Sequence, residues 1–282
     1  MKRVAHISDP HFGAHDRTLE RALLADLAGE TAPPPTLVAV SGDLTQRARA
    51  SQFMQARRFL GQIAAPVIVV PGNHDIPLFD VFRRVFRSRT RFCRYITRDL
   101  SPAWWDDTLV VVGVDTAKRF TIKGGEVRPA QVERVCAQLA SHPGSWKIVV
   151  AHHPFVIPAG VADGEDLVEG AAMATPRFEA VGVDLILSGH LHLPYSDDVA
   201  GRNPAHTIIA VHAGSCLSTR LRGEPNGYNM LCFDGPHCTI TPRLWDGTRF
   251  VDGDSKTYTR SGGRERIVRD APALWTTPSP HA

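Results

Sequence analysis

Five short apolar runs, each followed directly by a loop rich in Asp, His, Asn and Gly, constrain the fold of this chain more than any other feature of its sequence. The runs cover residues 4–8, 37–41, 67–70, 148–151 and 185–188. Short, unbroken stretches of Val, Ile and Leu are typical of strands that are covered on both faces. The chain is therefore expected to contain a sheet whose strands end in polar loops.

Helical spacing of apolar residues fills the segments between these runs. Leu19, Leu23 and Leu27 would lie on one helix face, and segments 53–63 and 132–139 show the same spacing. Alternation of strand and helix predicts an α/β fold with right-handed crossovers and a largely parallel sheet.

The last third of the chain has a different pattern. Strand-like runs at 206–212, 228–233, 239–245 and 248–251 are joined by turn residues, which predicts a second, mainly antiparallel sheet packed on the first. Residues 253–282 are polar and rich in Gly and Pro. We therefore expect one domain over residues 1–252, followed by a loose polar tail.

The composition narrows the class of protein. With 282 residues, of which 43% are hydrophobic and 22% charged, the chain can bury a large core without disulfides, and its five cysteines form no C-x-x-C pair. No apolar run approaches the ~20 residues of a membrane-spanning helix, and no signal-peptide pattern follows Met1, so a cytoplasmic location is expected. The formal net charge of +3 is too small to indicate a stable nucleic-acid partner.

The loops after the five apolar runs carry side chains that typically bind metal ions. Because ligand sites form beyond the carboxyl ends of parallel strands, these side chains are expected to converge at one sheet edge. Mixed oxygen and imidazole donors suit Mn, Fe or Zn. Seven donors are too many for one ion that must also bind substrate, so two ions sharing a bridging carboxylate are predicted. The candidate ligands are Asp9, His11, Asp43, Asn73, His152, His190 and His192.

The order of these motifs resembles that of the calcineurin-like metallophosphoesterases. The family pattern is D-x-H, G-D, G-N-H-[DE], a later His and G-H-x-H; it stands here at residues 9–11, 42–43, 72–75, 152 and 189–192. The order and loop lengths are most similar to those of the class III cyclic-nucleotide phosphodiesterases. The resemblance implies a single-domain, four-layer α/β/β/α sandwich of two mixed sheets, with a dinuclear centre at one edge.

The resemblance also implies a role for each residue. Asp9, His11 and His192 would hold the first ion, Asn73, His152 and His190 the second, and Asp43 would bridge the two. His153 is left as a candidate substrate contact, because the H-x-P pattern assigns the ligand to His152.

His74 would act on the phosphate or the leaving group, as the corresponding histidine does in the family. Many relatives orient that histidine with an Asp three residues after the bridging Asp, where this chain has Gln46. An uncharged Gln46 is expected to favour a protonated His74 less than an aspartate would.

Two cations lower the pKa of a bridging water and neutralise charge on a phosphoryl group, so hydrolysis by a bridging hydroxide is the expected mechanism. A phosphodiester is favoured as substrate, with cyclic nucleotides such as cAMP as the preferred class of small phosphorylated compound. Arg220 and Arg222 lie on a loop that either holds an anionic substrate group or is merely solvated.

Several alternatives stay open. A phosphomonoesterase, a nuclease and a lipid-linked pyrophosphate hydrolase of the UDP-diacylglucosamine type are other enzymatic interpretations, although the last typically carries Arg where this chain has His74. A non-catalytic scaffold of the same fold is the alternative from another class. A homodimer is one expected assembly.

Residues 78–98 carry seven arginines interleaved with aromatic residues. On a single helix, Phe79, Phe82 and Phe86 would share one side with Val85, and the opposite side would be basic. In one interpretation the apolar stripe packs on the core and the basic face is solvated. In the other, the segment is a basic cap that attracts an anionic substrate or contacts an anionic membrane surface.

Overall fold

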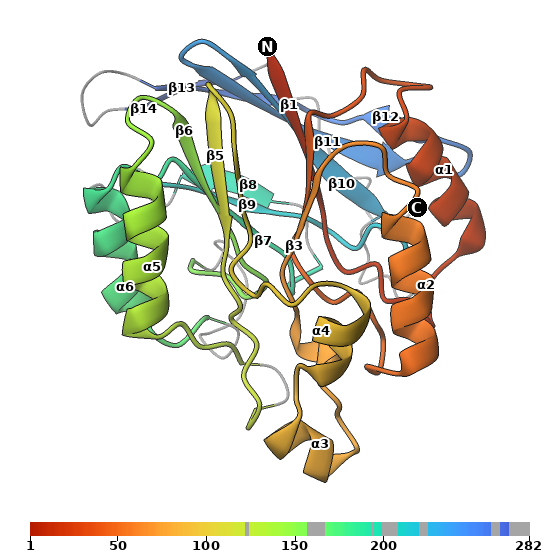
Figure 1. Ribbon diagram of the computed structural model, residues 1–282. Helices are drawn as coiled ribbons and strands as arrows, with labels where there is room; N and C mark the ends of the chain where they lie inside the picture. Colours follow the sequence, from red (N-terminus) through yellow and green to blue (C-terminus); the bar gives the residue numbers. More distant parts are fainter. Residues whose placement is uncertain are drawn as a thin grey trace, which may run out of the picture.

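Two mixed β-sheets lie at the centre of the molecule, and helices cover the outer face of each (Figure 1). The computed structural model describes residues 1–121, 124–156, 167–192, 195–198, 208–219, 225–260 and 266–270. The α/β fold of two mixed sheets expected from the sequence is confirmed.

The first sheet joins the beginning of the chain to its end. Its strands are β1 (Lys2–Ile7), β2 (Leu37–Val40), β3 (Val67–Val69), β10 (Gly227–Asp234), β11 (His237–Trp245), β12 (Phe250–Asp252), β13 (Lys256–Arg260) and β14 (Arg266–Asp270). They lie in the order β14-β13-β11-β10-β1-β2-β3, with β12 paired to β11. β1 is parallel to β2 and antiparallel to β10.

The second sheet is built from the middle of the chain. Its strands are β4 (Ala103–Trp105), β5 (Leu109–Gly113), β6 (Trp146–Val150), β7 (Leu185–Ser188), β8 (Tyr195–Asp198) and β9 (Ile209–His212). The order is β4-β5-β6-β7-β9-β8, in which the four central strands are parallel and the two edge strands antiparallel.

Helices bury one apolar face each against the sheets. α1 (Arg17–Leu27) and α2 (Ala50–Leu60) cover the first sheet, and α5 (Pro129–Ala140) and α6 (Ala171–Ala180) cover the second (Figure 1). A third apolar layer, which includes Ile148, Leu187 and Leu231, fills the space between the sheets. Among the described helices none could cross a bilayer, since α5, the longest, has 12 residues.

The predicted division of strands between the two sheets is wrong. β10 and the strands after it do not form a separate sheet; they extend the parallel strands β1–β3 through the β1–β10 pairing. The segment expected to be a loose tail also contributes β13 and β14, and β13 buries Tyr258. In β13, Tyr258 is the one apolar residue among polar ones, and this pattern is too weak to predict a strand from the sequence.

Residues 78–98 form two short helices, α3 (Val81–Phe86) and α4 (Thr90–Tyr95), where the sequence predicts one. The first helix ends because Arg87 has a φ of −141° and a ψ of 37°. For α3, the prediction that the apolar stripe packs on the core is wrong, since Phe82 and Phe86 are exposed and Arg84 is buried. The physical reason is that Arg84 donates to backbone carbonyl groups of neighbouring segments.

Candidate metal centre

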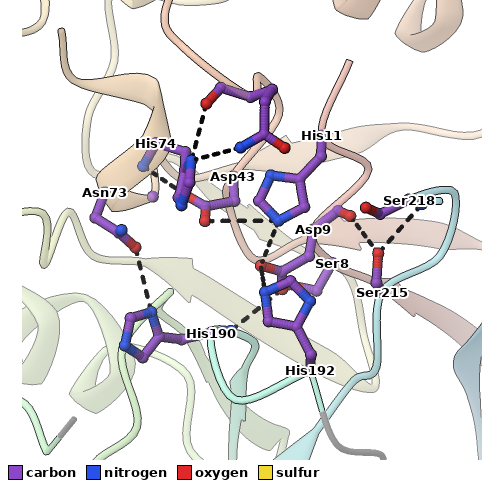
Figure 2. A network of polar contacts seen from close by, with 12 residues as sticks. Ser8, Asp9, His11, Asp43, Asn73, His74, His190, His192, Ser215 and Ser218 are labelled. Atoms are coloured by element: carbon purple, nitrogen blue, oxygen red, sulfur yellow. Dashed lines mark hydrogen bonds and ion pairs between the residues drawn. The ribbon is translucent and has the colours of Figure 1, made fainter. Parts of the chain in front are cut away.

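The carboxyl ends of β1, β2, β3, β6 and β7 bring all seven predicted metal-ligating side chains to one edge of the sheets. Figure 2 shows six of the seven, from Asp9 to His192, with their ring nitrogens and carboxylate oxygens turned toward one another. The convergence follows from the topology, because parallel strands end at the same edge.

Asp9, His11 and His192 form the first group. Asp9 Oδ1 lies 3.5 Å from His11 Nε2 and 3.6 Å from His192 Nε2. The other carboxylate oxygen, Oδ2, accepts hydrogen bonds from Ser8 Oγ at 2.6 Å and from the backbone N–H of His190 at 3.2 Å. Oδ1 is buried and has no hydrogen-bond partner in the described part of the chain, so it is the oxygen left to bind a cation.

Asn73, His152 and His190 form the second group. Asn73 Oδ1 lies 2.9 Å from His152 Nε2 and 3.2 Å from His190 Nδ1. His152 Nδ1–H donates to the backbone oxygen of Ser41 at 2.8 Å, because a carbonyl oxygen can only accept. This bond fixes the orientation of the ring and presents Nε2 to the second group, as supporting partners of metal-binding histidines do.

Asp43 lies between the two groups. Its Oδ2 is 4.0 Å from His11 Nε2 of the first group and 3.5 Å from His152 Nε2 of the second. Its Oδ1 accepts the backbone N–H of His74 at 2.8 Å. A carboxylate in this position could bridge two cations.

Strained backbone positions coincide with these side chains. Of the six non-glycine residues with positive φ in the described part of the chain, five are candidate ligands, with φ between 48° and 71°. Such conformations cost on the order of 1–3 kcal/mol each and persist only where the surrounding structure imposes them. The five residues are Asp9, His11, Asp43, His190 and His192.

Two motif glycines allow the loops to approach this closely. A Cβ at Gly72 would lie 2.1 Å from Asp43 Oδ1, and a Cβ at Gly189 would lie 1.9 Å from Ser8 Oγ. Any side chain at either position would displace the loop that carries a carboxylate ligand.

Burial sets the protonation of the group. It lowers the pKa of His11 to about 3 and of His152 to about 4, so both rings are neutral at pH 7, the form that binds metal ions. Burial raises the pKa of Asp43 to about 6. Neutral imidazoles, carboxylates and an amide oxygen together fit transition-metal ions. The candidate ligand atoms of Asp9, Asp43 and His152 all lie within 4.8 Å of one another, as do those of Asp9, His11 and His192.

His74 stands beside the centre, and its ring lies 4.9 Å from that of His11 (Figure 2). Its Nδ1–H donates to the backbone oxygen of Gln46 at 2.9 Å, and the Gln46 side-chain amide lies 3.2 Å from the same nitrogen. Gln46 therefore holds the position expected for the orienting residue, but its main-chain oxygen accepts the hydrogen bond from Nδ1–H. A ring nitrogen of His74 lies within 4.8 Å of donor atoms of His11 and Asp43, so the ring borders the candidate metal centre.

Asp75, the last residue of the G-N-H-D motif, has a role that the sequence did not reveal. Its carboxylate accepts the backbone N–H groups of Leu44 at 3.1 Å, Thr45 at 2.9 Å and Gly72 at 3.1 Å. It thereby ties the loop that carries Asp43 to the loop that carries Asn73. Burial, and next the charge of Asp43, raise the pKa of Asp75 to about 7. The motif was the only signal, and it does not say what the side chain contacts.

The three predicted substrate contacts are not brought to the centre in the same way. His153 is fully buried, its Nδ1 lies 2.9 Å from Thr116 Oγ1, and its ring lies 4.8 Å from His190. A ring nitrogen of His153 also lies within 4.8 Å of ring nitrogens of His152 and His190, so His153 is a further candidate metal donor rather than an exposed substrate contact. Arg220 and Arg222 lie outside the described residues.

Comparison with known proteins finds a family model and several phosphodiesterases that are similar to this chain. A family model described as calcineurin-like phosphoesterase matches residues 2–194. A cAMP/cGMP dual specificity phosphodiesterase of Mycobacterium tuberculosis (strain CDC 1551 / Oshkosh) is 26% identical over 247 residues, covering 79% of this chain and 70% of that protein. The glycerophosphodiester phosphodiesterase GpdQ of Enterobacter lignolyticus (strain SCF1) is 35% identical over 80 residues, 26% of this chain. The chain spans only 29% of the length of this Enterobacter protein.

Solved structures with the same fold include PhoD, with a TM-score of 0.72 and 10% identity, covering 97% of this chain and 72% of that one. The purple acid phosphatase PPD1 from yellow lupin (Lupinus luteus) seeds has a TM-score of 0.62 and 15% identity, covering 93% of this chain and 54% of that one. At such identities the likeness shows the fold alone, and it agrees with the two-sheet architecture described above.

Proposed function

The chain belongs to the calcineurin-like phosphoesterase family, and from this premise we propose that it hydrolyses phosphodiester bonds at a dinuclear transition-metal centre. One observation carries the proposal: the Asp43 carboxylate lies near donors of both groups, since its Oδ2 is 4.0 Å from His11 Nε2 of the first and 3.5 Å from His152 Nε2 of the second. We propose Asp9, His11 and His192 as ligands of the first ion and Asn73, His152 and His190 as ligands of the second. Mn, Fe or Zn are the proposed metals.

When bound, two such ions supply an activated water and neutralise charge on the phosphoryl group. The protein supplies the rest. Asp9 and Asp43 hold negative charge at fixed positions because Ser8 and the backbone of His74 and His190 bind their second oxygens. The buried Asp75 keeps the two central loops together.

His74 is proposed to act on the leaving group. Its Nδ1 proton is engaged by the Gln46 carbonyl, so a second proton on Nε2 would be available to the departing oxygen of the ester. Gln46 holds the ring without adding a charge. Proton transfer from His74 is therefore proposed to matter most for substrates whose leaving group must be protonated.

Cyclic nucleotides such as cAMP are the proposed substrate class. The relatives named as cyclic nucleotide and glycerophosphodiester phosphodiesterases support a diester. All seven proposed ligand positions carry side chains that can bind a metal ion, which favours an enzyme over a scaffold. The cytoplasmic location and the homodimer stay predictions.

A hydrolysis panel on the metal-loaded protein tests the proposal. Bis(p-nitrophenyl) phosphate and cAMP should be hydrolysed, and a chelator should abolish turnover, whereas p-nitrophenyl phosphate and UDP-diacylglucosamine should be poorer substrates. Hydrolysis of the monoester alone, or turnover that survives complete metal removal, would contradict it.

A further inference from the structure

The segment around α3 turns apolar side chains toward solvent. Phe79, Phe82 and Phe86 are 78%, 63% and 72% exposed, and Phe120 on the neighbouring loop is 71% exposed. Of the nine large apolar side chains exposed in the described part of the chain, four lie between residues 79 and 86. α3 lies at the foot of the molecule, away from both sheets (Figure 1). Such a cluster marks an interaction surface.

Polar contacts hold this surface in place. Arg84 is buried and donates to the backbone oxygens of Pro77, at 3.1 Å, and of Thr121. Arg119 donates to the backbone oxygen of Val85 at 3.2 Å. The arginines therefore face inward and fasten α3 to the loop after β5, which leaves the phenylalanines outside.

A basic cavity of about 770 Å³ adjoins this surface, since Phe86 is part of its lining. Six arginines line it, together with Asp115 and Glu126. The two acids are already paired, Asp115 with Arg89 and Glu126 with Arg128 at 3.0 Å. Four arginines have no acidic partner within the ranges that the structure describes: Arg87, Arg94, Arg98 and Arg119.

Charge decides what can cover the surface. Residues 78–98 contain seven arginines and one acid, Asp80, so a second copy of this chain would bring like charge against like charge. An anionic bilayer offers what both features require: an apolar region for the phenylalanines and phosphate groups for the arginine forks.

We propose that this face docks on an anionic membrane surface. Phe79, Phe82, Phe86 and Phe120 enter the boundary between headgroups and acyl chains, and the unpaired arginines of the cavity bind the phosphate of an anionic phospholipid. The surface adjoins the metal centre, since the Arg47 guanidinium stacks 5.2 Å from the centre of the Phe79 ring and Arg47 lines a small hollow with His74. The proposal does not rest on the catalytic one, because docking needs no metal.

Vesicle co-sedimentation tests the docking. The full chain should bind phosphatidylcholine vesicles that contain phosphatidylglycerol and leave pure phosphatidylcholine vesicles in the supernatant. Phe82→Ser with Phe86→Ser should weaken binding by about tenfold or more, since burial of each ring contributes on that order. Arg94→Gln with Arg98→Gln should weaken it by about tenfold, and by less at high salt, where screening already reduces the attraction.

Matched control variants distinguish docking by this surface from non-specific adsorption to vesicles. Arg17→Gln with Arg21→Gln removes the same charge from α1, and Trp105→Ser removes an exposed aromatic ring from β4; both should bind like the wild type. Hydrolysis of a soluble diester should be unchanged in all these variants. Absence of binding at low salt, or equal losses in the controls, would overturn the proposal. The proposal would also be overturned if pyrophosphate stabilised the protein while the protein did not bind vesicles, since the cavity would then bind a soluble anion.

Discussion

Two buried polar clusters, one around Asp26 and one around Asp43, differ in whether the buried carboxylate has a cationic partner. Asp26 accepts two hydrogen bonds from Arg243, at 2.7 and 3.2 Å, and one from Tyr228 at 2.7 Å. Around Asp43, by contrast, the described ion-pair partners are histidines alone, at 3.5 Å or more. The first cluster balances its charge internally, and the second does not.

The backbone shows the same contrast. Neither Asp26 nor Arg243 nor Tyr228 has a positive φ, whereas five of the seven candidate metal ligands do. A strained cluster in which Asp9 Oδ1 has no hydrogen-bond partner among the described residues is suited to bind a cation. The contrast therefore separates a polar cluster whose charges are paired within the fold from one that is suited to bind cations, as proposed above.

The largest effect is expected for Asp43→Asn. An amide cannot bridge two cations with charge, so diester hydrolysis should fall by more than ~100-fold, beyond what loss of a mere supporting partner causes. The matched variant Asp26→Asn changes the same atoms in the other cluster and should retain wild-type turnover per folded molecule. Equal losses in the two variants would remove the distinction between the clusters.

His74→Asn should lower turnover of substrates with poor leaving groups by about 10²–10⁴-fold. Because His74 is not placed as a ligand, metal content should persist. A comparison of alkyl and activated aryl diesters measures the effect. Equal losses for both would argue against proton donation to the leaving group.

Arg243→Met should leave metal content unchanged and lower the free energy of unfolding by about 3–5 kcal/mol, since Asp26 then stays buried without its counter-charge. Chemical denaturation measures the loss. The double variant with Asp26→Asn should recover part of it. A stable Arg243→Met protein that fails to bind metal would mean that the two clusters depend on each other.

The strands, and the meeting of the loops that follow them, could be predicted from the local sequence pattern. The five apolar runs became strands, and the loops after them converge because parallel strands end together. Gln46 was expected beside His74 and lies there. Contacts between distant segments were not predictable: Arg243 reaches Asp26 across 217 positions, and β10 pairs with β1 from the far end of the chain.

The segment 78–98 shows the same limit. The single helix predicted here is broken at Arg87, and helical spacing alone does not say which side of α3 faces the core. Arg84 turns inward because carbonyl groups of Pro77 and Thr121 accept its guanidinium, and neither partner is visible in the local spacing.

Elemental analysis of the metal-loaded protein tests the central claim most directly. Two transition-metal ions per chain are expected for the wild type and for Asp26→Asn, and fewer than two for Asp43→Asn, because Asp43 Oδ2 lies near donors of both groups. A wild-type protein that holds one ion or none under saturating metal, or an Asp43→Asn variant that still holds two, would contradict the dinuclear centre.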